Sequence, residues 1–338
     1  MERLRVGILG CGAVAGFHAG RLAALDEVQI AGLADPSPQS IDRLRQRVSL
    51  DGVPAFTSPA ELYESVQVDA VVIATPHTLH HPMIMQALER GLHVLCEKPL
   101  ACTPEEARDI AGASAVSGLT VTVGYQRHFD PGYVYMRDVI DRGELGELRA
   151  VSITCGQHWN DRTQSGWRQV PELSGGGMLM DTGSHIIDLL CWLVGKPLLE
   201  ARAIVENRGR PVDIDTTATL AFEDGVQAQL TVLGDLPFTW LESVVVTGTK
   251  AALRYENDPQ HPWRPGQVSR FTEEAETRPL NLRAGTEDVV TAWVATIRGE
   301  RQNPVPPQAG VRVAEVTRAI LEAGQALSAA RTGAVPAS

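Results

Sequence analysis

Apolar runs and amphipathic stretches alternate regularly through the first 126 residues. The apolar runs Leu4–Gly10, Val28–Asp35 and Val68–Thr75 have the length and composition of strands buried in a parallel sheet. Amphipathic stretches between and after them, such as His80–Arg90, predict helices. This alternation predicts an α/β domain with a doubly wound parallel sheet, a Rossmann-type fold, at residues 1–126.

The pattern changes in the second half, where strands follow one another with little helix between them. They are expected near residues 148–158, 199–206, 216–222, 226–233, 242–248, 251–255 and 267–272. Such a series predicts an α+β domain at 127–330 built on a largely antiparallel open sheet. Helices at 287–298 and 311–330 are expected to close the chain and pack back on the first domain, before a flexible tail at 331–338.

One segment of the second half, Leu179–Val194, is apolar on most sides, which is typical of a buried helix. Asp181, His185 and Asp188 interrupt it at i, i+4 and i+7 and therefore share one face. Polar groups on a buried helix are costly unless they are paired or used. In one interpretation Asp181 or Thr182 caps the helix, and His185 and Asp188 are core groups with hydrogen-bond partners. In the other, a carboxylate holds a histidine that works as a general base. The glycines at 175–177 are interpreted as room for a ligand against this helix.

A glycine-rich motif directly follows the first strand. Residues 10–15 read G-x-G-x-x-A and open a helix, so that Gly10 permits a tight turn and Gly12 lets a pyrophosphate approach the backbone. The next strand ends in Asp35, where a ribose 2′-hydroxyl would be held, although a helix cap before Pro36 is compatible with the same position. This combination predicts dinucleotide binding, with NAD favoured over NADP. The expected cofactor contacts are Gly10, Cys11, Gly12, Ala13, Val14, Asp35, Thr75, Pro76, His77, His80, Glu97, Lys98 and Gln126.

Glu97-Lys98-Pro99 follows another predicted strand, at the sheet edge where ligands of such folds bind. A lysine there could polarise or orient a substrate oxygen; the alternative is a surface Lys–Glu pair that contributes little. The neighbouring histidines at 77, 80 and 81 could suggest a metal site, but no nearby carboxylate completes the ligand set. We therefore expect no metal.

Composition narrows the classes of partner. The chain has 338 residues and a net charge of -11, which argues against nucleic acid and anionic membranes. No apolar run is long enough to span a membrane. Met1 is followed at once by charges and a strand pattern, so no signal peptide is expected, and the five scattered cysteines fit a reducing cytoplasm.

Three separated motifs together resemble the Gfo/Idh/MocA oxidoreductases, the family named for glucose-fructose oxidoreductase and inositol 2-dehydrogenase. They are GILGCGAVAGFHA, TPHTLHHPMIMQALERGLHVLCEKPLA and GGGMLMDTGSHIIDL, and the resemblance extends to about Leu327. It implies that Lys98, Asp181 and His185 are catalytic. The family often has asparagine where this chain has His77, which leaves that cofactor contact open. The resemblance also implies that the protein forms dimers or tetramers through the open sheet of the second domain.

The resulting hypothesis is an NAD-dependent dehydrogenase acting on a secondary alcohol of a sugar, sugar derivative or cyclitol. His185 would take the proton of the substrate hydroxyl, and Asp181 would orient the imidazole or the substrate. Lys98 would form a hydrogen bond with the same hydroxyl oxygen. The expected substrate contacts are Lys98, Arg127, Trp159, Trp167, Arg168, Asp181 and His185. The tryptophans could stack on a sugar or merely anchor a loop. A redox-assisted eliminase or glycosidase that recycles its cofactor, and a nucleotide-sensing regulatory protein, remain alternatives.

Overall fold

The computed structural model describes residues 3–262, 264, 266–279, 282 and 287–332. The chain forms two compact units. Unit 1 comprises Met1–Ala101, Glu105–Tyr125 and Glu287–Val311, and unit 2 comprises Cys102–Pro104, Gln126–Thr286 and Arg312–Ser338. The closing segment is thus divided between the units, because its first helix packs on the first helix of unit 1.

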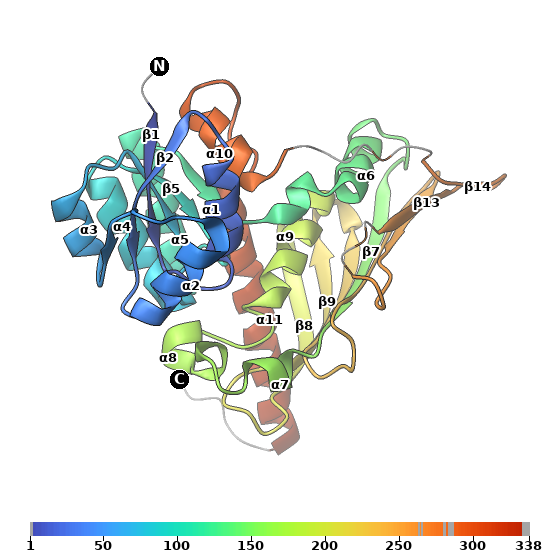
Figure 1. The fold of residues 1–338 in the computed structure, drawn as a ribbon. Coiled ribbons are helices and arrows are strands. Elements are labelled where there is room, and N and C mark those ends of the chain that lie inside the picture. Colours follow the sequence, from blue (N-terminus) through green and yellow to red (C-terminus); the bar gives the residue numbers. More distant parts are fainter. Residues whose placement is uncertain (1–2, 263, 265, 280–281, 283–286, 333–338) are drawn as a thin grey trace. The chain divides into compact units, whose positions relative to one another are not determined.

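Unit 1 is a six-stranded parallel sheet of order β3-β2-β1-β4-β5-β6. Helices α3 and α4 lie on one side of its strands and α1 on the other (Figure 1). The strands are β1 Leu4–Leu9, β2 Val28–Ala34, β3 Ala55–Phe56, β4 Ala70–Ile73, β5 His93–Cys96 and β6 Val121–Val123. The helices are α1 Ala15–Ala23, α2 Pro38–Val48, α3 Pro59–Ser65, α4 His80–Glu89, α5 Pro104–Ser117 and α10 Val289–Ile297, with a short 3-10 helix η1 at His77–Leu79.

The core of unit 1 follows from strands buried on both faces. All four residues of β4 are buried, which explains why β4 is continuously apolar rather than alternating. The sequence prediction of a doubly wound parallel sheet is confirmed. This arrangement brings the carboxyl ends of β1, β2, β4 and β5 to one edge of the sheet.

Unit 2 is an eight-stranded sheet of order β14-β13-β12-β11-β7-β10-β9-β8. Its neighbouring strands are antiparallel except for the pair β7 and β10. The strands are β7 Leu148–Gly156, β8 Leu198–Glu206, β9 Asp215–Phe222, β10 Gln227–Leu233, β11 Leu241–Gly248, β12 Ala252–Glu256, β13 Gln267–Phe271 and β14 Glu276–Thr277. The predicted, largely antiparallel second sheet is therefore confirmed.

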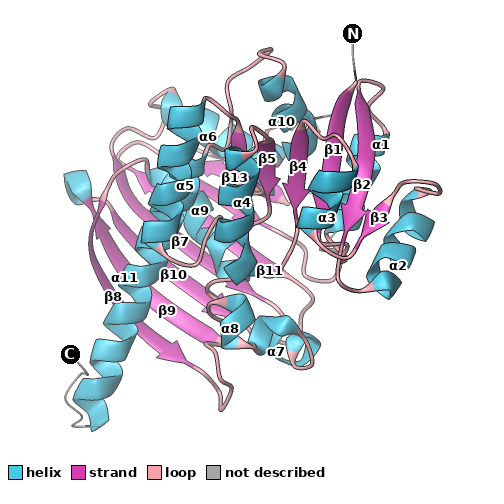
Figure 2. Ribbon diagram, turned by 90° about the vertical axis from the view of Figure 1, so that its left-hand side faces the viewer, coloured by secondary structure: helices cyan, strands magenta, loops and turns pink. Residues whose placement is uncertain are grey.

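Helices cover one face of this second sheet. They include α6 Pro131–Asp141, α9 Thr182–Val194 and α11 Pro307–Thr332, and shorter turns are η2 Gln126–Phe129, α7 Trp159–Thr163, η3 Trp167–Gln169, α8 Pro171–Ser174 and η4 Glu223–Gly225. Figure 2 shows α9 and α11 in front of β7 to β10. Buried and exposed residues alternate along β9 and β10, so the strands present their polar positions to the opposite face.

Helix α9 is buried along almost its whole length, as its apolar composition predicts. Only Trp192 among its thirteen residues is not classed as buried. No described helix is long and apolar enough to cross a membrane.

Candidate active site

The dinucleotide motif forms the turn between β1 and α1. Gly10 has φ +86°, and a Cβ there would lie 2.6 Å from the carbonyl oxygen of Ala74, so only glycine fits. A Cβ on Gly12 would meet no atom within 4 Å, which means that the backbone is open on that side. The turn therefore fits a ligand that approaches the backbone at Gly12.

Asp35 closes the same site from the end of β2. Its Oδ2 accepts the backbone N–H of Cys11 at 2.7 Å and its Oδ1 accepts that of Ser37 at 2.8 Å. A carboxylate has about four lone-pair positions, so each oxygen can accept a further donor such as a ribose hydroxyl. Burial, with the charge of Asp35, raises the pKa of the Cys11 thiol to about 12, and Cys11 stays protonated at neutral pH.

A cavity of about 270 Å³ lies beside this loop, between α1 and α2. It is lined by Cys11, Gly12, Ala13, Gly16, Ser40, Arg43, Leu44 and Arg47. Arg47 donates to the carbonyl oxygen of Ala13 at 3.1 Å. Arg43 and Arg47 lie one helical turn apart on the same face of α2, and the sequence analysis predicted neither as a site residue.

The three neighbouring histidines do not converge. His80 is fully buried, and its ring nitrogens lie 3.0 Å from the carbonyl oxygen of Thr75 and 2.7 Å from that of Pro99. His77 packs edge-on against it, whereas Nε2 of the half-buried His81 lies 3.7 Å from a carboxylate oxygen of the exposed Asp109. Among the described residues no set of three or more His, Cys, Asp or Glu side chains could hold a metal ion. His80 is predicted to contact a cofactor, but both of its ring nitrogens face backbone carbonyls.

Glu97, Lys98 and Pro99 follow β5 as expected, but Glu97 is not half of a surface pair with Lys98. Its Oε1 lies 2.6 Å from Nε2 of the buried His18 in α1, and its Oε2 accepts the backbone N–H of Lys98 at 3.3 Å. Lys98 itself is half-buried. His18 is a site residue that sequence reasoning missed, since 79 residues separate it from Glu97.

The remaining predicted cofactor contacts lie at or near strand ends. Thr75 and Pro76 follow β4, and the Thr75 hydroxyl contacts the sulfur of Met83 at 3.6 Å. Val14 stands at the N-cap position of α1 without capping it through its side chain. Gln126 is exposed at the start of η2 in unit 2.

In unit 2 the Asp181 carboxylate accepts hydrogen bonds from side chains of two segments, α7 and η3. Its Oδ2 accepts the indole N–H of Trp159 and the Nε–H of Arg168, each at 2.8 Å. The Arg168 guanidinium in turn lies over the ring of Trp167, 4.5 Å from its centroid. The structure thus brings four of the predicted substrate residues together. Asp181 occupies the N-cap position of α9 but makes no capping hydrogen bond, so the capping interpretation fails for Asp181.

One turn beyond Asp181, His185 is 7% exposed. The third member of the polar face, Asp188, instead accepts a hydrogen bond from Nε2 of His128 at 2.9 Å. The His128 ring stacks on Trp192 at 4.2 Å. Asp188 is therefore a core group with its own hydrogen-bond partner. The polar face of α9 does not act as one unit, because Asp181 and Asp188 bind different side chains.

Arg127, predicted to contact substrate, is buried and paired with Glu242. Glu242 also accepts from the Tyr133 hydroxyl and from the indole N–H of Trp240 at 3.0 Å. Burial alone would lower the pKa of Arg127, but the charge of Glu242 raises it well above its usual range. In this structure Arg127 joins β11 to the segment after β6.

The glycine run before α9 is explained by packing. A Cβ on Gly177 would lie 2.0 Å from the carbonyl oxygen of Asp213, and one on Gly176 would lie 2.9 Å from Met180. The Asp213 carboxylate also accepts the backbone N–H groups of Gly177 and Leu179, at 2.8 and 2.7 Å. Protein atoms, not a ligand, therefore occupy the space beside these two glycines, and the sequence interpretation is wrong on this point.

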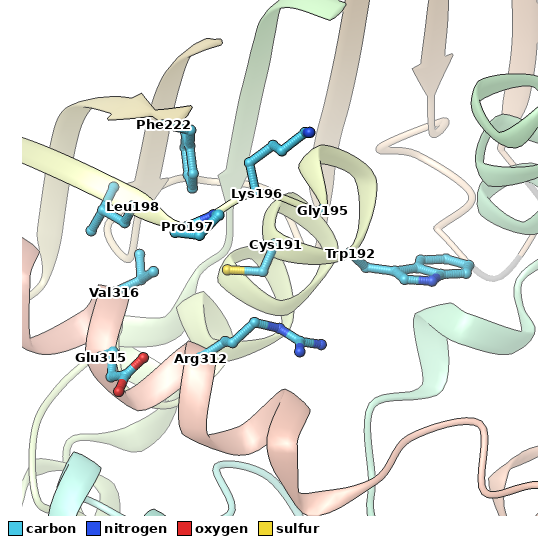
Figure 3. Close-up of a pocket in the computed structure, with 10 residues that line it drawn as sticks. All are labelled: Cys191, Trp192, Gly195, Lys196, Pro197, Leu198, Phe222, Arg312, Glu315 and Val316. Carbon is cyan, nitrogen blue, oxygen red and sulfur yellow. The ribbon is translucent and has the colours of Figure 1, made fainter. Parts of the chain in front are cut away.

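A second cavity, of about 700 Å³, lies in unit 2 between the end of α9 and α11 (Figure 3). Its walls include Cys191, Phe222 and Val316, with Lys196 and Arg312 beside them. Burial raises the pKa of the Cys191 thiol to about 12, and Lys196 is paired with Asp224. Neither Asp181 nor His185 lines this cavity.

Comparison with known proteins supports the interpretation of both units. Residues 4–125 match the model of an oxidoreductase family with an NAD-binding Rossmann fold, and residues 133–254 match the GFO/IDH/MocA C-terminal domain. The rhizopine catabolism protein MocA of Rhizobium meliloti is 34% identical over 58% of this chain and 59% of its own length. Inositol 2-dehydrogenase 4 of Saccharopolyspora erythraea is 32% identical over 58% of this chain and 56% of its own. The chain thus matches less than two thirds of the length of these two relatives.

One solved structure resembles nearly the whole chain. GenD2 from gentamicin A biosynthesis, in complex with NAD, is 25% identical with a TM-score of 0.82, covering 96% of this chain and 95% of GenD2. The order of the strands, the glycine turn and the two family matches lead to the same assignment. The chain is a member of the Gfo/Idh/MocA family of NAD-binding oxidoreductases.

Proposed function

We propose that this protein is an NAD-dependent dehydrogenase that oxidises a secondary alcohol of a sugar, sugar derivative or cyclitol, or reduces the corresponding ketone. The observation that carries the proposal is the Asp181 cluster, in which Trp159 and Arg168 hold a buried carboxylate one turn before His185. Charge-assisted hydrogen bonds fix such a carboxylate in one orientation. The carboxylate and imidazole are then spaced to orient a hydroxyl group and accept its proton.

The cofactor choice rests on Asp35. A carboxylate at the end of the second strand favours a ribose 2′-hydroxyl and repels a 2′-phosphate. Because Asp35 is held by the N–H groups of Cys11 and Ser37, it cannot easily turn away from a phosphate. We therefore expect NAD to be used more efficiently than NADP.

A bound NAD would supply the acceptor for the hydride that leaves the alcohol carbon. His185 accepts the hydroxyl proton as the carbon–oxygen bond becomes a carbonyl, and Asp181 orients the hydroxyl. The Lys98 ammonium donates a hydrogen bond to the same oxygen and stabilises the negative charge that develops on it. In the reverse direction protonated His185 returns the proton to the ketone oxygen.

The assay that tests this proposal follows NADH absorbance while the protein is incubated with NAD and a panel of cyclitols and sugars, beginning with myo-inositol. A dehydrogenase produces NADH continuously with one of them. Production that stops at one equivalent per active site indicates an eliminase or glycosidase that recycles its cofactor. No NADH with any compound, despite measurable NAD binding, favours a nucleotide sensor. The assay repeated with NADP tests the cofactor preference.

We place this activity in the cytoplasm. None of the five cysteines forms a disulfide in the structure, and four of them are buried. Thiols of this kind persist without oxidation in a reducing compartment.

A further inference from the structure

Arg168 contacts Asp181 through one N–H group only. Its Nε–H donates to Asp181 Oδ2 at 2.8 Å, and neither terminal nitrogen, Nη1 or Nη2, has a hydrogen-bond partner in the part of the chain that the structure describes. An arginine that fixes a carboxylate frequently does so with two parallel N–H groups. In Arg168 the terminal fork of the guanidinium is left for a different group.

The orientation of the Asp181 carboxylate does not depend on Arg168 alone. The same oxygen, Oδ2, accepts the indole N–H of Trp159 at 2.8 Å, and Trp159 is only 3% exposed. Arg168 adds a positive charge beside the carboxylate, which favours its ionised form. That role requires no solvent-accessible fork, yet the Arg168 side chain is 39% exposed. Arg168 therefore has a feature that its contact with Asp181 does not explain.

The plane of the Arg168 guanidinium is held by its neighbours in η3. The guanidinium carbon lies 4.5 Å from the centroid of the Trp167 ring, a cation–π arrangement that favours one orientation of the fork. The next residue, Gln169, is buried and fastens η3 to α7, because its amide donates to the Asn160 carbonyl oxygen at 2.6 Å and to the Thr163 hydroxyl at 3.0 Å. A cation held in this way loses little conformational freedom when it binds an anion.

We propose that Arg168 binds a carboxylate of the substrate, so that the substrate is an acidic sugar or cyclitol derivative, such as a uronate. The terminal fork of a guanidinium matches the two oxygens of a carboxylate. Because Nε is bonded to Asp181, a substrate whose reacting hydroxyl lies against Asp181 brings its neighbouring carbons beside the fork. The positive charge of Arg168 then lies between two carboxylates and offsets their repulsion. The inference rests on the proposed function only in placing the substrate at Asp181.

The test measures binding, so that it does not require turnover. The full-length protein is saturated with NADH, which prevents oxidation of an alcohol, and is titrated by calorimetry with D-glucuronate and D-galacturonate. The methyl esters of the two uronates and the parent sugars D-glucose and D-galactose are titrated in parallel. At least one uronate should bind about tenfold or more tightly than its own methyl ester, as expected for hydrogen bonds between charged groups. This advantage should shrink as the salt concentration rises.

Three variants assign the preference to Arg168. Arg168→Gln keeps an amide that can donate to Asp181 but removes the charge, so the affinity ratio of uronate to ester should fall to about one. Arg168→Lys keeps the charge without the fork and should give an intermediate ratio. Arg162→Gln is the matched control, because Arg162 is exposed on α7, and its ratio should stay within about twofold of wild type. A purely structural Arg168 would weaken acid and ester alike and leave the ratio unchanged.

The inference is overturned if wild type prefers neither uronate over its ester, a comparison that needs no variant to fold. It is equally overturned if Arg168→Gln keeps the preference, or if D-glucose 6-phosphate or D-galactose 6-phosphate binds more tightly than both uronates. The proposed function fails differently. Uronates that bind through Arg168 but yield no NADH from NAD contradict the dehydrogenase and leave the carboxylate site intact. Continuous NADH production from a neutral sugar, without a preference for acids, supports the dehydrogenase and contradicts the carboxylate site.

Discussion

At the scale of single residues, contacts within unit 2 distinguish the buried polar groups that serve packing from the carboxylate that we propose meets the substrate. Asp188 is paired with His128 and Arg127 with Glu242, and each pair ties an element to its neighbour. Asp181 also has partners, Trp159 and Arg168, but they come from α7 and η3, the two short helices after β7, and Arg168 is only half-buried. The sequence spacing treats Asp181 and Asp188 alike, and only their contacts distinguish them.

Lys98→Ala should remove most turnover and leave NAD affinity nearly unchanged, because Lys98 is assigned to the substrate oxygen and not to the dinucleotide turn. Loss of a positioned proton-transfer or oxyanion group lowers kcat by roughly 10²- to 10⁴-fold. Steady-state kinetics and NAD titration by calorimetry check both quantities. Lys196→Ala, at an exposed pair with Asp224, is the control and should behave like wild type. Retention of more than about a tenth of kcat would make Lys98 structural.

His80 should make the protein sensitive to mild acid. Burial and the nearby His77 lower the pKa of His80 from 6.5 to about 4, although the carbonyls of Pro99 and Thr75 favour the charged form. The unfolded chain therefore binds a proton that the folded chain does not, so stability is present above pH 6.5 and is lost as pH falls toward 4. At about pH 5 this loss is on the order of 2 kcal/mol.

The loss can be isolated by comparing wild type with His80→Gln, which is uncharged at every pH and can still donate to one carbonyl. Unfolding free energies from urea titrations at about pH 7.5 and 5 should fall more for wild type than for the variant. Equal losses would show that another group is responsible.

At the scale of elements, most strands and helices could be predicted from periodicity, because the spacing of apolar residues within an element reflects which of its faces is buried. The continuous apolar run of β4 and the nearly uniform burial of α9 are examples. Contacts between elements could not be predicted in this way. The His18–Glu97 contact depends on the order in which β1, β4 and β5 pair. The Trp159–Asp181 contact depends on α7, a helix too short to show a periodic pattern in the sequence.

The glycines at 175–177 are another case in which the sequence pattern could not predict a contact between distant segments. A glycine signals either room for a ligand or close approach of the chain, and the sequence does not distinguish the two. Only the structure reveals that the backbone of Asp213 lies against Gly177.

Gly177→Ala should consequently destabilise unit 2, because its Cβ would overlap the Asp213 carbonyl and displace the segment that leads into α9. Overpacking of this kind costs about 1–3 kcal/mol. Gly20→Ala is the matched control: Gly20 is exposed in α1 with no atom within 4 Å of its ideal Cβ, so alanine there should be neutral or stabilise by up to about 1 kcal/mol. Thermal unfolding of the two variants measures the contrast, and similar shifts would contradict it.

At the scale of the whole molecule, the face of the second sheet opposite α9 and α11 is the surface we propose for a homodimer or homotetramer. Thr219, Gln229 and Ser152 align across β9, β10 and β7 on that face, and all three are exposed. These three uncharged side chains, at adjacent positions of neighbouring strands, suit the centre of a self-complementary interface.

Multi-angle light scattering should therefore give twice or four times the 36.5 kDa of the chain. Gln229→Arg, which adds a charge on that face, should lower the measured mass, whereas a charge added at exposed Gly20 in α1 should not. A monomer for wild type at micromolar concentration would contradict the proposed surface.

The measurement that tests the central claim most directly is kcat/KM for alcohol oxidation as a function of pH, for wild type and for His185→Asn. If His185 is the base, wild type shows an ascending limb, because a protonated imidazole cannot accept the hydroxyl proton, and ketone reduction shows the reverse dependence. His185→Asn should lose that limb and about two to four orders of magnitude in kcat. A variant that is less stable but keeps both the rate and the shape of the profile would instead make His185 a satisfied core histidine.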